Sequence, residues 1–329
     1  MPANARPIGE WVSALLSGER RAVADALNVL DDRRPAAVAI AGKLLAALPT
    51  ERIEHEGQII GLTGPPGVGK SSLSAVLIAA WRTQGKRVGV LAVDPTSPLS
   101  GGALLGDRLR MAQGAPDPGV FIRSLAGRGE IGGLAALVLP MARVMATAFD
   151  VVLLETIGVG QSEVDVALHS DTTVLVVQPA SGDTLQFLKA GVTEIPAVVA
   201  VNKADLGRPA RKARDEMEAA LRYAPMADWV VPVLLCSALY KSGVDDLVAA
   251  LERHRLLLSQ TGRLRQRRRD GVAAWGLRRL REEFGRHGVE ILGGADSVLA
   301  RFTEGDAPFY DVLEASRAEL LQRFGSRTI

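Results

Sequence analysis

The chain has 329 residues, of which 47% are hydrophobic and 23% are charged, a balance that is typical of a globular protein and excludes a disordered or fibrous chain. Its 39 basic and 37 acidic residues leave a formal net charge of +2, which is too small to favour nucleic acid as a partner. The single cysteine, Cys236, excludes an intramolecular disulfide framework and a zinc site built from cysteines, and it fits a reducing cytoplasm.

The first segment of the chain, from Ile8 to about Leu48, repeats apolar residues at helical spacing, as at Trp11, Leu15 and Leu16. This pattern predicts a small arm of amphipathic helices. No charged stretch followed by an uninterrupted apolar run opens the chain, so we expect no secretory signal. The most apolar stretches are well short of the roughly 20 residues that span a bilayer. We therefore expect a cytoplasmic protein that has no membrane partner.

The central segment, from Gln58 to about Leu239, alternates short apolar runs with helical patterns. Such alternation predicts an α/β fold with a mostly parallel, doubly wound sheet that has helices on both faces. The apolar runs that we expect to form strands are Ile59–Thr63, Val88–Asp94, Val151–Glu155, Thr173–Gln178, Ala197–Asn202 and Val230–Cys236.

The last segment is helical to the end of the chain after Gly243, with predicted helices at Val244–Leu258, Gly271–Phe284, Ala295–Phe302 and Pro308–Phe324. Its own core is too small for a comfortable domain, so its amphipathic helices must pack on the central domain or on a second subunit. The sequence leaves these two arrangements open. The predicted division is an N-terminal helical arm at 1–55, a central domain at 56–255 and a C-terminal helical arm at 256–329.

A phosphate-binding motif follows the first predicted strand. The run Gly64-Pro65-Pro66-Gly67-Val68-Gly69-Lys70-Ser71 matches G-x-x-x-x-G-K-[ST] at every fixed position, and a predicted helix from Ser72 to Trp81 follows. The glycines allow the backbone to curl so that successive N–H groups point inward, and the helix N-terminus favours phosphate oxygens. We expect Lys70 to reach the β- and γ-phosphates and the Ser71 hydroxyl to bind Mg²⁺. The central segment is therefore predicted to be a P-loop nucleotide-binding domain.

Acidic residues near the phosphate motif indicate a metal site. Asp94 and Glu155 each close a predicted strand, and Asp107 lies in a glycine-bearing loop. Carboxylate and hydroxyl oxygens are ligands that Mg²⁺ prefers. The predicted metal ligands are therefore Ser71, Asp94, Asp107 and Glu155, although each acid could instead be a helix cap or a solvated charge.

Hydrolysis at such a site consists mostly of positioning the phosphates and stabilising charge. Lys70 and Glu155 are predicted catalytic residues, because one would hold the phosphates and the other would face the metal. Gly158 is placed to donate its backbone N–H to the γ-phosphate and to sense its loss. Gln161 is the candidate for orienting the attacking water, but a loop glutamine is more often simply solvated. We therefore predict slow hydrolysis that a partner accelerates.

A base-binding motif, Asn202-Lys203-Ala204-Asp205, directly follows the apolar run Ala197–Val201. The Asp205 carboxylate can accept hydrogen bonds from the ring N–H and the exocyclic amine of guanine, whereas adenine would leave that charge unpaired. We expect the Lys203 stem to lie over the base plane. At the end of the next predicted strand, a backbone N–H in Ser237-Ala238-Leu239 would meet the carbonyl of the base. The predicted ligands are therefore GTP and GDP.

These motifs together resemble one family, the methylmalonyl-CoA-mutase-associated GTPases, also called the MeaB/ArgK family, within the SIMIBI class of P-loop GTPases. The likeness extends from about residue 10 to about residue 280, and its most specific motif is ETIGVGQSE at Glu155–Glu163. The other segments that carry the resemblance are Leu62–Ser72, Val93–Pro98, Gly101–Arg108, Ser181–Asp183 and Asn202–Asp205.

The resemblance implies a homodimeric GTPase chaperone that escorts an adenosylcobalamin-dependent acyl-CoA mutase, gates loading of the cofactor and protects the enzyme. It implies the same metal ligands and guanine contacts as those inferred from the residues. It also implies a mobile loop that relays the nucleotide state to the mutase. The polar residues of that loop match Asp183, Gln186 and Lys189, although Lys189 taken alone is an ordinary solvated helix residue. The C-terminal helices would form the dimer arm.

Two segments near the predicted switches depart from the family pattern. Relatives usually have G-D-K-T-R-M where this chain has Gly106–Met111, and a Pro-Ser-Pro run followed by G-T-L-G-G where it has Ser124–Gly133. A loop that faces a partner should vary with the partner. The partner is therefore either methylmalonyl-CoA mutase or a sibling mutase that acts on another branched thioester, such as an isobutyryl or hydroxyisobutyryl thioester.

Two other functions remain open. A nickel-insertion GTPase shares the phosphate loop but should bring paired histidines or cysteines, whereas His55, His169, His254 and His287 are isolated in the sequence. A small-molecule or protein kinase needs a second substrate pocket near the γ-phosphate, and the sequence shows no recognisable one. The run Arg263–Arg269 is interpreted as a solvated helix face or as ion pairs across a subunit contact rather than as a nucleic-acid site.

Overall fold

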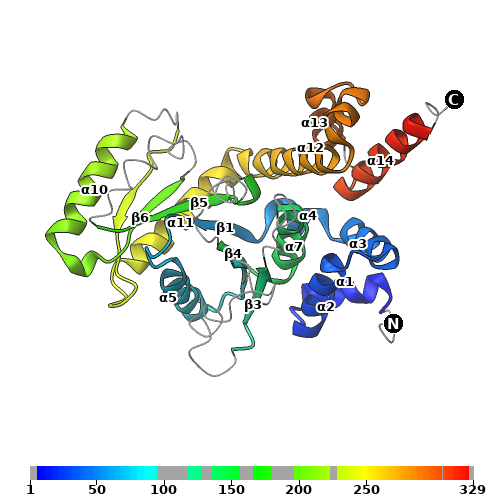
Figure 1. Cartoon of the computed structure of the whole chain (residues 1–329). Coiled ribbons are helices and arrows are strands. Elements are labelled where there is room, and N and C mark those ends of the chain that lie inside the picture. The colour runs from blue at the N-terminus through cyan, green and yellow to red at the C-terminus, as the bar shows by residue number, and fades with distance from the viewer. Residues whose placement is uncertain are drawn as a thin grey trace, which may run out of the picture. The chain divides into compact units, whose positions relative to one another are not determined.

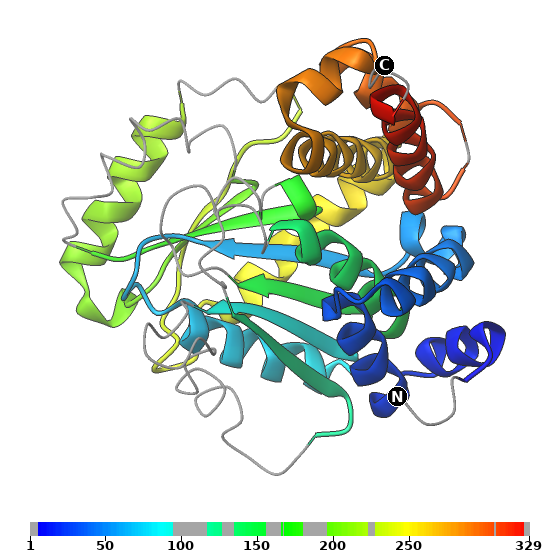
Figure 2. The same ribbon diagram turned by 45° about the vertical axis from the view of Figure 1, so that its right-hand side comes forward.

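The computed structural model describes residues 6–94, 117–126, 135–155, 166, 168–179, 196–222, 228–305 and 307–325. The chain folds into two compact units, whose elements are shown in Figure 1 and Figure 2. The sheet unit consists of Gly57–Glu130 and Phe149–Leu264. The helical unit consists of Met1–Glu56, Ile131–Ala148 and Arg265–Ile329. Each unit therefore combines segments that are far apart in the sequence.

A seven-stranded sheet in the order β3-β2-β4-β1-β5-β6-β7 forms the centre of the sheet unit. Every described strand pair is parallel, and helices flank the sheet, which confirms the predicted α/β fold class. The strands are β1 (Gln58–Thr63), β2 (Val88–Asp94), β3 (Val120–Ala126), β4 (Val151–Glu155), β5 (Thr172–Val177), β6 (Val198–Val201) and β7 (Val233–Leu235).

The strand β3 is the element that the sequence analysis missed. It lies at one end of the strand order, where β2 is its one partner among the described strands. Its residues Arg123 and Ser124 interrupt an otherwise apolar run. An edge strand has a neighbour on one side only and tolerates polar residues, so its apolar signal is weaker than that of a central strand.

Alternate side chains of the central strands enter opposite faces of the sheet. On one face, Ile60 and Val174 belong to a core that includes residues of α5 and α11. On the other face, Leu175 and Val199 belong to a core that includes residues of α10. The helices of this unit are α5 (Lys70–Thr83), α10 (Arg208–Leu221), α11 (Val244–Gln260) and the short 3-10 helix η2 (Ala204–Leu206). Because β1, β4 and β5 are buried along their whole length, they have the continuous apolar runs from which the strands were predicted.

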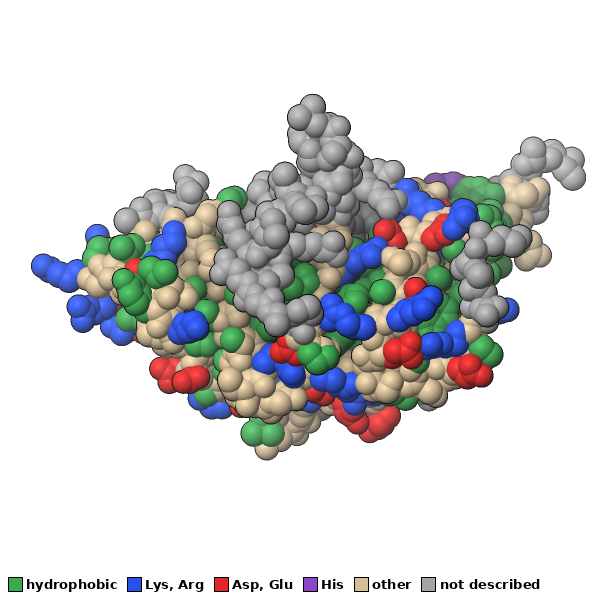
Figure 3. All heavy atoms as spheres, turned by 90° about the horizontal axis from the view of Figure 1, so that it is seen from below, with side chains coloured by type: hydrophobic (Ala, Val, Ile, Leu, Met, Phe, Trp, Pro, Cys, Tyr) green, Lys and Arg blue, Asp and Glu red, His purple; other side chains and the backbone are tan. Residues whose placement is uncertain are grey.

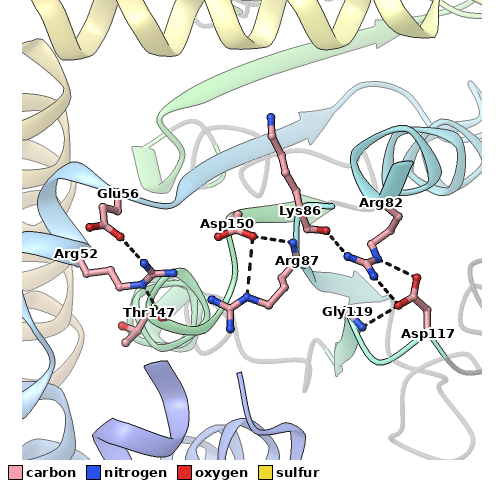
Figure 4. A network of polar contacts seen from close by, with 9 residues as sticks. All are labelled: Arg52, Glu56, Arg82, Lys86, Arg87, Asp117, Gly119, Thr147 and Asp150. Atoms are coloured by element: carbon pink, nitrogen blue, oxygen red, sulfur yellow. Dashed lines mark hydrogen bonds and ion pairs between the residues drawn. The ribbon is translucent and has the colours of Figure 1, made fainter. Parts of the chain in front are cut away.

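A bidentate ion pair ties the C-terminal turn of α5 to the chain that enters β3, as Figure 4 shows. Nε and Nη2 of Arg82 donate to the two carboxylate oxygens of Asp117 at 2.8 and 3.0 Å. The N–H of Gly119 donates to the same carboxylate at 2.8 Å. The Arg82 guanidinium, followed by the Gly119 N–H, holds the pKa of Asp117 below its ordinary value. The pair therefore links the phosphate-loop helix to the edge strand.

The helical unit brings together both ends of the chain. Its helices are α1 (Ile8–Leu16), α2 (Arg20–Asp31), α3 (Pro35–Ala47), α4 (Thr50–His55), α7 (Ala135–Ala148), most of α12 (Arg263–Ile291), α13 (Ala295–Thr303) and α14 (Phe309–Gly325). A Cβ atom at Gly42 of α3 would lie 2.9 Å from Cε1 of Tyr310 in α14. The last helix therefore packs on the N-terminal helices of its own chain, and dimerisation through the C-terminal helices stays a prediction.

The predicted C-terminal helices are confirmed, although the bounds of one differ. The sequence predicts a helix from Gly271 to Phe284, whereas α12 begins at Arg263, has a kink at Gly285 directly after the predicted end, and includes a second helical segment up to Ile291. Gly285 inside α12 has a φ of 68°, a left-handed conformation that glycine adopts without a steric penalty. The helix therefore bends at this residue and then resumes. Within the described parts of the chain, no helix combines the length and the apolar character needed to cross a membrane.

The arginine-rich run lies at the start of α12 and is engaged by acids of the same chain. Nε of Arg265 lies 2.7 Å from Oε2 of Glu54, and Nε of Arg269 lies 3.8 Å from Oε1 of that residue. Arg263 pairs with Asp228. These ion pairs lie within the chain, whereas the sequence analysis expected a solvated helix face or pairs across a subunit contact, and the subunit contact stays a prediction. On the face drawn in Figure 3, basic and acidic side chains are interspersed.

Candidate nucleotide-binding site

The residues predicted to bind a nucleotide follow the carboxyl ends of several strands. In a parallel sheet these ends lie at one edge, which is where open α/β sheets bind ligands. β1 leads into the loop 64–69 and then into α5, β4 ends at Glu155, and β6 and β7 lead to Asn202 and Ser237. Because β1 lies between β4 and β5 in the sheet, the loop has the ends of both strands as neighbours.

The loop 64–69 depends on glycine for both conformation and space. Gly64 has a φ of 137°, and a Cβ atom there would lie 2.1 Å from the carbonyl oxygen of Val176 in β5. Gly69 is the N-cap of α5 with a φ of 91°, and a Cβ atom there would lie 2.5 Å from Nδ2 of Asn202. Residues with a side chain are strained in this conformation. The loop therefore packs closely on its neighbours and leads directly into the start of a helix, a place that suits an anion.

Lys70 is the first residue of α5 and is only 7% exposed, so its ammonium group is held within the site rather than in solvent. Nζ of Lys70 donates hydrogen bonds to the carbonyl oxygens of Gly64 at 2.7 Å and Pro65 at 3.0 Å. Both acceptors are neutral, so these bonds orient the ammonium group without cancelling its charge. The loop thus combines a positive side chain with the positive end of a helix dipole.

The carboxylate of Glu155 is bound by two hydroxyl groups of α5. Oγ of Ser71 donates to Oε1 at 2.5 Å, and Oγ of Ser74 donates to Oε2 at 2.9 Å. Glu155 is 5% exposed, and hydrogen bonds to a buried carboxylate are stronger than those between neutral groups. The sequence analysis missed Ser74, although its position about one helical turn after Ser71 was an available signal.

The structure places some of the predicted metal ligands together. The hydroxyl proton of Ser71 is engaged by Glu155, which leaves the lone pairs of the Ser71 oxygen for a cation. Asp94 is the last residue of β2, the strand whose Ala92 lies opposite Glu155 in the sheet. The backbone of Asp94 therefore lies at the same end of the sheet, where the carboxyl ends of the strands meet. The side chain of Asp94 and the whole of Asp107 fall outside the described residues.

Asn202 joins the phosphate loop to the loop after β7. Its Nδ2 donates to the carbonyl of Val68 at 2.9 Å, and its Oδ1 accepts a hydrogen bond from the N–H of Ala238 at 3.1 Å. Its own backbone N–H donates to the carbonyl of Val177 at 2.8 Å. Asn202 is 2% exposed, so it acts as a buried connector that fixes three segments relative to one another.

Lys203 has an uncommon backbone conformation for a residue with a side chain, with a φ of 60° and a ψ of 39°. Its Nζ donates to the carbonyl of Gly67 at 3.0 Å and to Oε1 of Gln178. The lysine stem therefore extends from the chain after β6 to the phosphate loop. Gln178 is a second residue that the sequence analysis missed, because its contact depends on the order of the strands.

Asp205 lies in η2 and is joined to the loop after β7. Its Oδ1 accepts a hydrogen bond from Oγ of Ser237, which is 1% exposed and therefore a fixed donor. Ser237 and Ser242 exchange backbone hydrogen bonds at 2.9 and 3.2 Å, which closes the loop between them. Asp205 itself is exposed, and Leu239 at the tip of this loop is 75% exposed. Asp205 and Ser237 thus lie together, and of these two the Asp205 side chain is the exposed one.

The remaining predicted site residues fall into two groups. Ser72 is exposed on the first turn of α5, and Pro66 is exposed in the phosphate loop. The others lie outside the described part of the chain, and they are Asp107, Gly158, Gln161, Asp183, Gln186 and Lys189. Their predicted roles stay predictions.

The sequence matches the model of one protein family over residues 23–289, and that family is described as methylmalonyl Co-A mutase-associated GTPase MeaB. A protein of Pyrococcus horikoshii whose name assigns it to the GTPases is 40% identical over 276 residues, or 81% of this chain and 84% of the relative. GTPase ArgK of Escherichia coli is 34% identical over 287 residues, or 85% of each chain.

A relative in Caenorhabditis elegans is named methylmalonic aciduria type A homolog, mitochondrial, and is 33% identical over 284 residues, or 82% of this chain and 71% of the relative. Among solved structures, the crystal structure of a protein titled LAO/AO transport system kinase aligns with a TM-score of 0.69. It is 25% identical, and the alignment covers 99% of this chain and 100% of that chain. The fold is therefore shared over almost the whole length.

Proposed function

This chain belongs to the MeaB family of methylmalonyl Co-A mutase-associated GTPases, and from that premise we propose that it binds and hydrolyses GTP as the chaperone of an adenosylcobalamin-dependent acyl-CoA mutase. The observation that carries the nucleotide part is the double contact of Asn202 with Val68 and Ala238. A buried amide that joins the phosphate side of the site to the base side sets the distance between them. A nucleotide would occupy both sides at once, with its phosphates in the loop 64–69 and its base beside Ala238, so this distance must match the length of the nucleotide.

The phosphates of GTP would lie in the loop 64–69, at the start of α5. Lys70 would donate to oxygens of the β- and γ-phosphates, and the backbone N–H groups of the loop would surround them. These positive groups stabilise the negative charge that develops as water attacks the γ-phosphorus and the bond to the β-phosphate oxygen breaks. The products are GDP and inorganic phosphate.

Ser71 and Glu155 would hold Mg²⁺ beside the phosphates, with Asp94 and Asp107 as the other proposed ligands. The donor set fits this ion, because hydroxyl and carboxylate oxygens are hard ligands and the two described groups lie 2.5 Å apart. A bound Mg²⁺ supplies neutralisation of the phosphate charge. Ser74 would keep the second oxygen of Glu155 oriented.

Guanine would be selected by the Asp205 carboxylate, which Ser237 holds in position. Guanine offers a ring N–H and an exocyclic amine to this carboxylate, whereas adenine offers no matching pair of donors. The backbone near Ala238 would contact the carbonyl of the base, and Leu239 would lie beside it. The Lys203 stem would cover one face of the base.

The partner is proposed from the family. The family description names methylmalonyl Co-A mutase, and the relative in Caenorhabditis elegans is named for methylmalonic aciduria. We propose a cytoplasmic homodimer in which Asp183, Gln186 and Lys189 relay the nucleotide state to the mutase. Gly158 would sense the γ-phosphate and Gln161 would orient the water. A sibling mutase acting on another branched acyl-CoA is the alternative partner.

Two measurements test this function. Calorimetry with Mg²⁺ present should show binding of GDP but not of ADP, and the absence of heat with guanosine nucleotides would overturn nucleotide binding. Pull-down of the chain from its native extract, with GTP or GDP bound, should recover an acyl-CoA mutase that accelerates phosphate release. If the recovered mutase left the rate unchanged, the chaperone role would be wrong while nucleotide binding stood.

A kinase is the second candidate, because the structure that aligns over almost the whole chain is titled a transport system kinase. The two functions differ in the phosphate acceptor. With γ-labelled GTP or ATP and native extract, a GTPase releases the label as inorganic phosphate, whereas a kinase transfers it to a protein or a small molecule. Transfer to any acceptor other than water would favour the kinase.

A further inference from the structure

Gln178 directly follows β5, and its side chain contacts Lys203 of the base-binding motif. Its Oε1 accepts a hydrogen bond from Nζ of Lys203, which also donates to the carbonyl of Gly67 at 3.0 Å. We propose that Gln178 is a positioning residue for the nucleotide, which holds the Lys203 side chain in the place where it covers the base. This inference rests on the proposed binding of GTP.

The backbone fixes the two partners relative to each other. β5 and β6 pair in parallel, and Val177 lies opposite Val201 in their register. The next contact along the pair is the hydrogen bond from the N–H of Asn202 to the carbonyl of Val177, at 2.8 Å. The side-chain contact between Gln178 and Lys203 is the step after that. The pairing of β5 and β6 therefore places Gln178 and Lys203 next to each other, one residue beyond the last backbone hydrogen bond.

Lys203 needs such an anchor for two reasons. Its backbone is in the left-handed region, a conformation that costs free energy in a residue with a side chain and persists only where the surroundings impose it. Its long side chain also loses much rotamer freedom when it is held in one orientation. Gly67 belongs to a glycine-rich loop, whereas Gln178 extends from β5, which is buried along its whole length. The sheet therefore holds the backbone from which the Gln178 acceptor extends.

The amide of glutamine suits this position chemically. Its oxygen accepts the hydrogen bond from the ammonium group but carries no net charge. The positive charge of Lys203 is therefore not neutralised and can still attract an anionic nucleotide. A side chain of similar length without an acceptor, such as methionine, would fill the space and lose the bond. A glutamate would keep the bond but add a negative charge close to the phosphate loop.

The test compares affinities for a fluorescent GDP analogue and for XDP in the wild type and in variants of Gln178 and Lys203. Gln178→Met should weaken GDP binding by about tenfold, since a hydrogen bond to a charged group is lost, and most of the change should lie in faster dissociation. The melting temperature of the nucleotide-free protein and the ratio of GDP to XDP affinity should stay at the wild-type values, because base choice belongs to Asp205. Gln178→Glu keeps an acceptor for Lys203 but adds a negative charge, so its GDP affinity should lie between those of the wild type and Gln178→Met.

A double-mutant cycle shows whether Gln178 acts through Lys203. Lys203→Met should weaken binding, and adding Gln178→Met to it should cause no further loss. Gln84→Met is the matched control, because Gln84 is exposed at the far end of α5, roughly 20 Å along the helix from the phosphate loop. Gln178→Asn, whose side chain is one carbon shorter and draws the acceptor away from Lys203, carries the same expectation if Gln178→Met fails to fold.

Wild-type affinity in Gln178→Met would overturn the inference, since a residue that only fills space is replaced by methionine without loss. A full tenfold loss on top of Lys203→Met would overturn it as well, because Gln178 would then act by another route. Neither result would affect the proposed function. A wild-type chain that binds no guanine nucleotide would overturn the proposed function, and the inference would fall with it.

Discussion

The Glu155 carboxylate at the end of β4 accepts a hydrogen bond of 2.5 Å from the Ser71 hydroxyl in the first turn of α5. Ser74 donates to the other oxygen of the same carboxylate at 2.9 Å. Both oxygens of Glu155 are therefore oriented by the helix that begins at the phosphate loop. Ser71, Glu155 and Ser74 therefore form one hydrogen-bonded network. Because Ser74 contacts only the proposed metal ligand Glu155 in this network, replacing Ser74 should weaken Mg²⁺ binding more than nucleotide binding.

Replacing Ser74 with alanine should raise the Mg²⁺ concentration needed for half-maximal GTP hydrolysis by about 10- to 100-fold, which is the usual cost of removing a group that orients a metal ligand. GDP affinity measured with a chelator present should not change. Phosphate release as a function of Mg²⁺ concentration provides the measurement. Thr83→Ala, at the exposed C-terminal end of the same helix, is the control. An unchanged Mg²⁺ requirement in Ser74→Ala would contradict the role given to Glu155.

Replacing Asp205 with asparagine should lower GDP affinity by roughly three orders of magnitude and should create affinity for XDP. The NH₂ group of asparagine would face the exocyclic amine of guanine, so that two donors meet. Xanthine has a carbonyl in place of that amine, and this carbonyl can accept the hydrogen bond. Competition with a fluorescent nucleotide measures both affinities. Asp215→Asn, on the exposed surface of α10, should leave both unchanged. Unchanged affinity for GDP in Asp205→Asn would show that another residue selects the base.

The ion pair between Arg82 and Asp117 predicts a pH dependence of stability. The pKa of Asp117 is lowered in the folded chain, first by Arg82 and then by the Gly119 N–H. A carboxyl group of lowered pKa stabilises the fold at pH values above its unfolded pKa of about 3.9, and this stabilisation is lost as the pH falls through the lowered pKa.

Asp117→Asn should therefore be less stable than the wild type at pH 7, and the difference should shrink as the pH falls below about 4, the pKa of an unfolded aspartate. Urea denaturation of both proteins at several pH values measures the free energies of unfolding. A difference that stayed constant over this range would mean that the carboxylate charge of Asp117 is not what stabilises the contact.

The helical unit offers a test of its packing. A Cβ atom at Gly276 of α12 would lie 2.2 Å from Cζ of Phe302 in α13, so Gly276→Ala forces the ring to move and should destabilise the chain by about 1–3 kcal/mol. Gly9 in α1 has no heavy atom within 4 Å of such a Cβ atom, and Gly9→Ala should change stability by less than about 0.5 kcal/mol. Equal effects of the two substitutions, measured by urea denaturation, would contradict the contact between α12 and α13.

The local elements of the site could be predicted from the sequence because their determinants are contiguous. The run from Gly64 to Ser71 contains its own turn chemistry and is flanked by an apolar strand and an amphipathic helix. The motif from Asn202 to Asp205 likewise follows directly on an apolar run. Buried parallel strands have continuous apolar sequences, so their positions were also predictable.

The contacts between these elements were decided by the tertiary structure alone. Ser74 meets Glu155 because β4 lies beside β1, and Gln178 meets Lys203 because β5 pairs with β6. Gly42 meets Tyr310 because the two ends of the chain share one unit. The hydrophobic pattern of a strand or helix specifies which face is buried but not which neighbour covers it. The order β3-β2-β4-β1-β5-β6-β7 departs from the order of the strands along the chain, and so these pairs follow only from the packing of the whole chain.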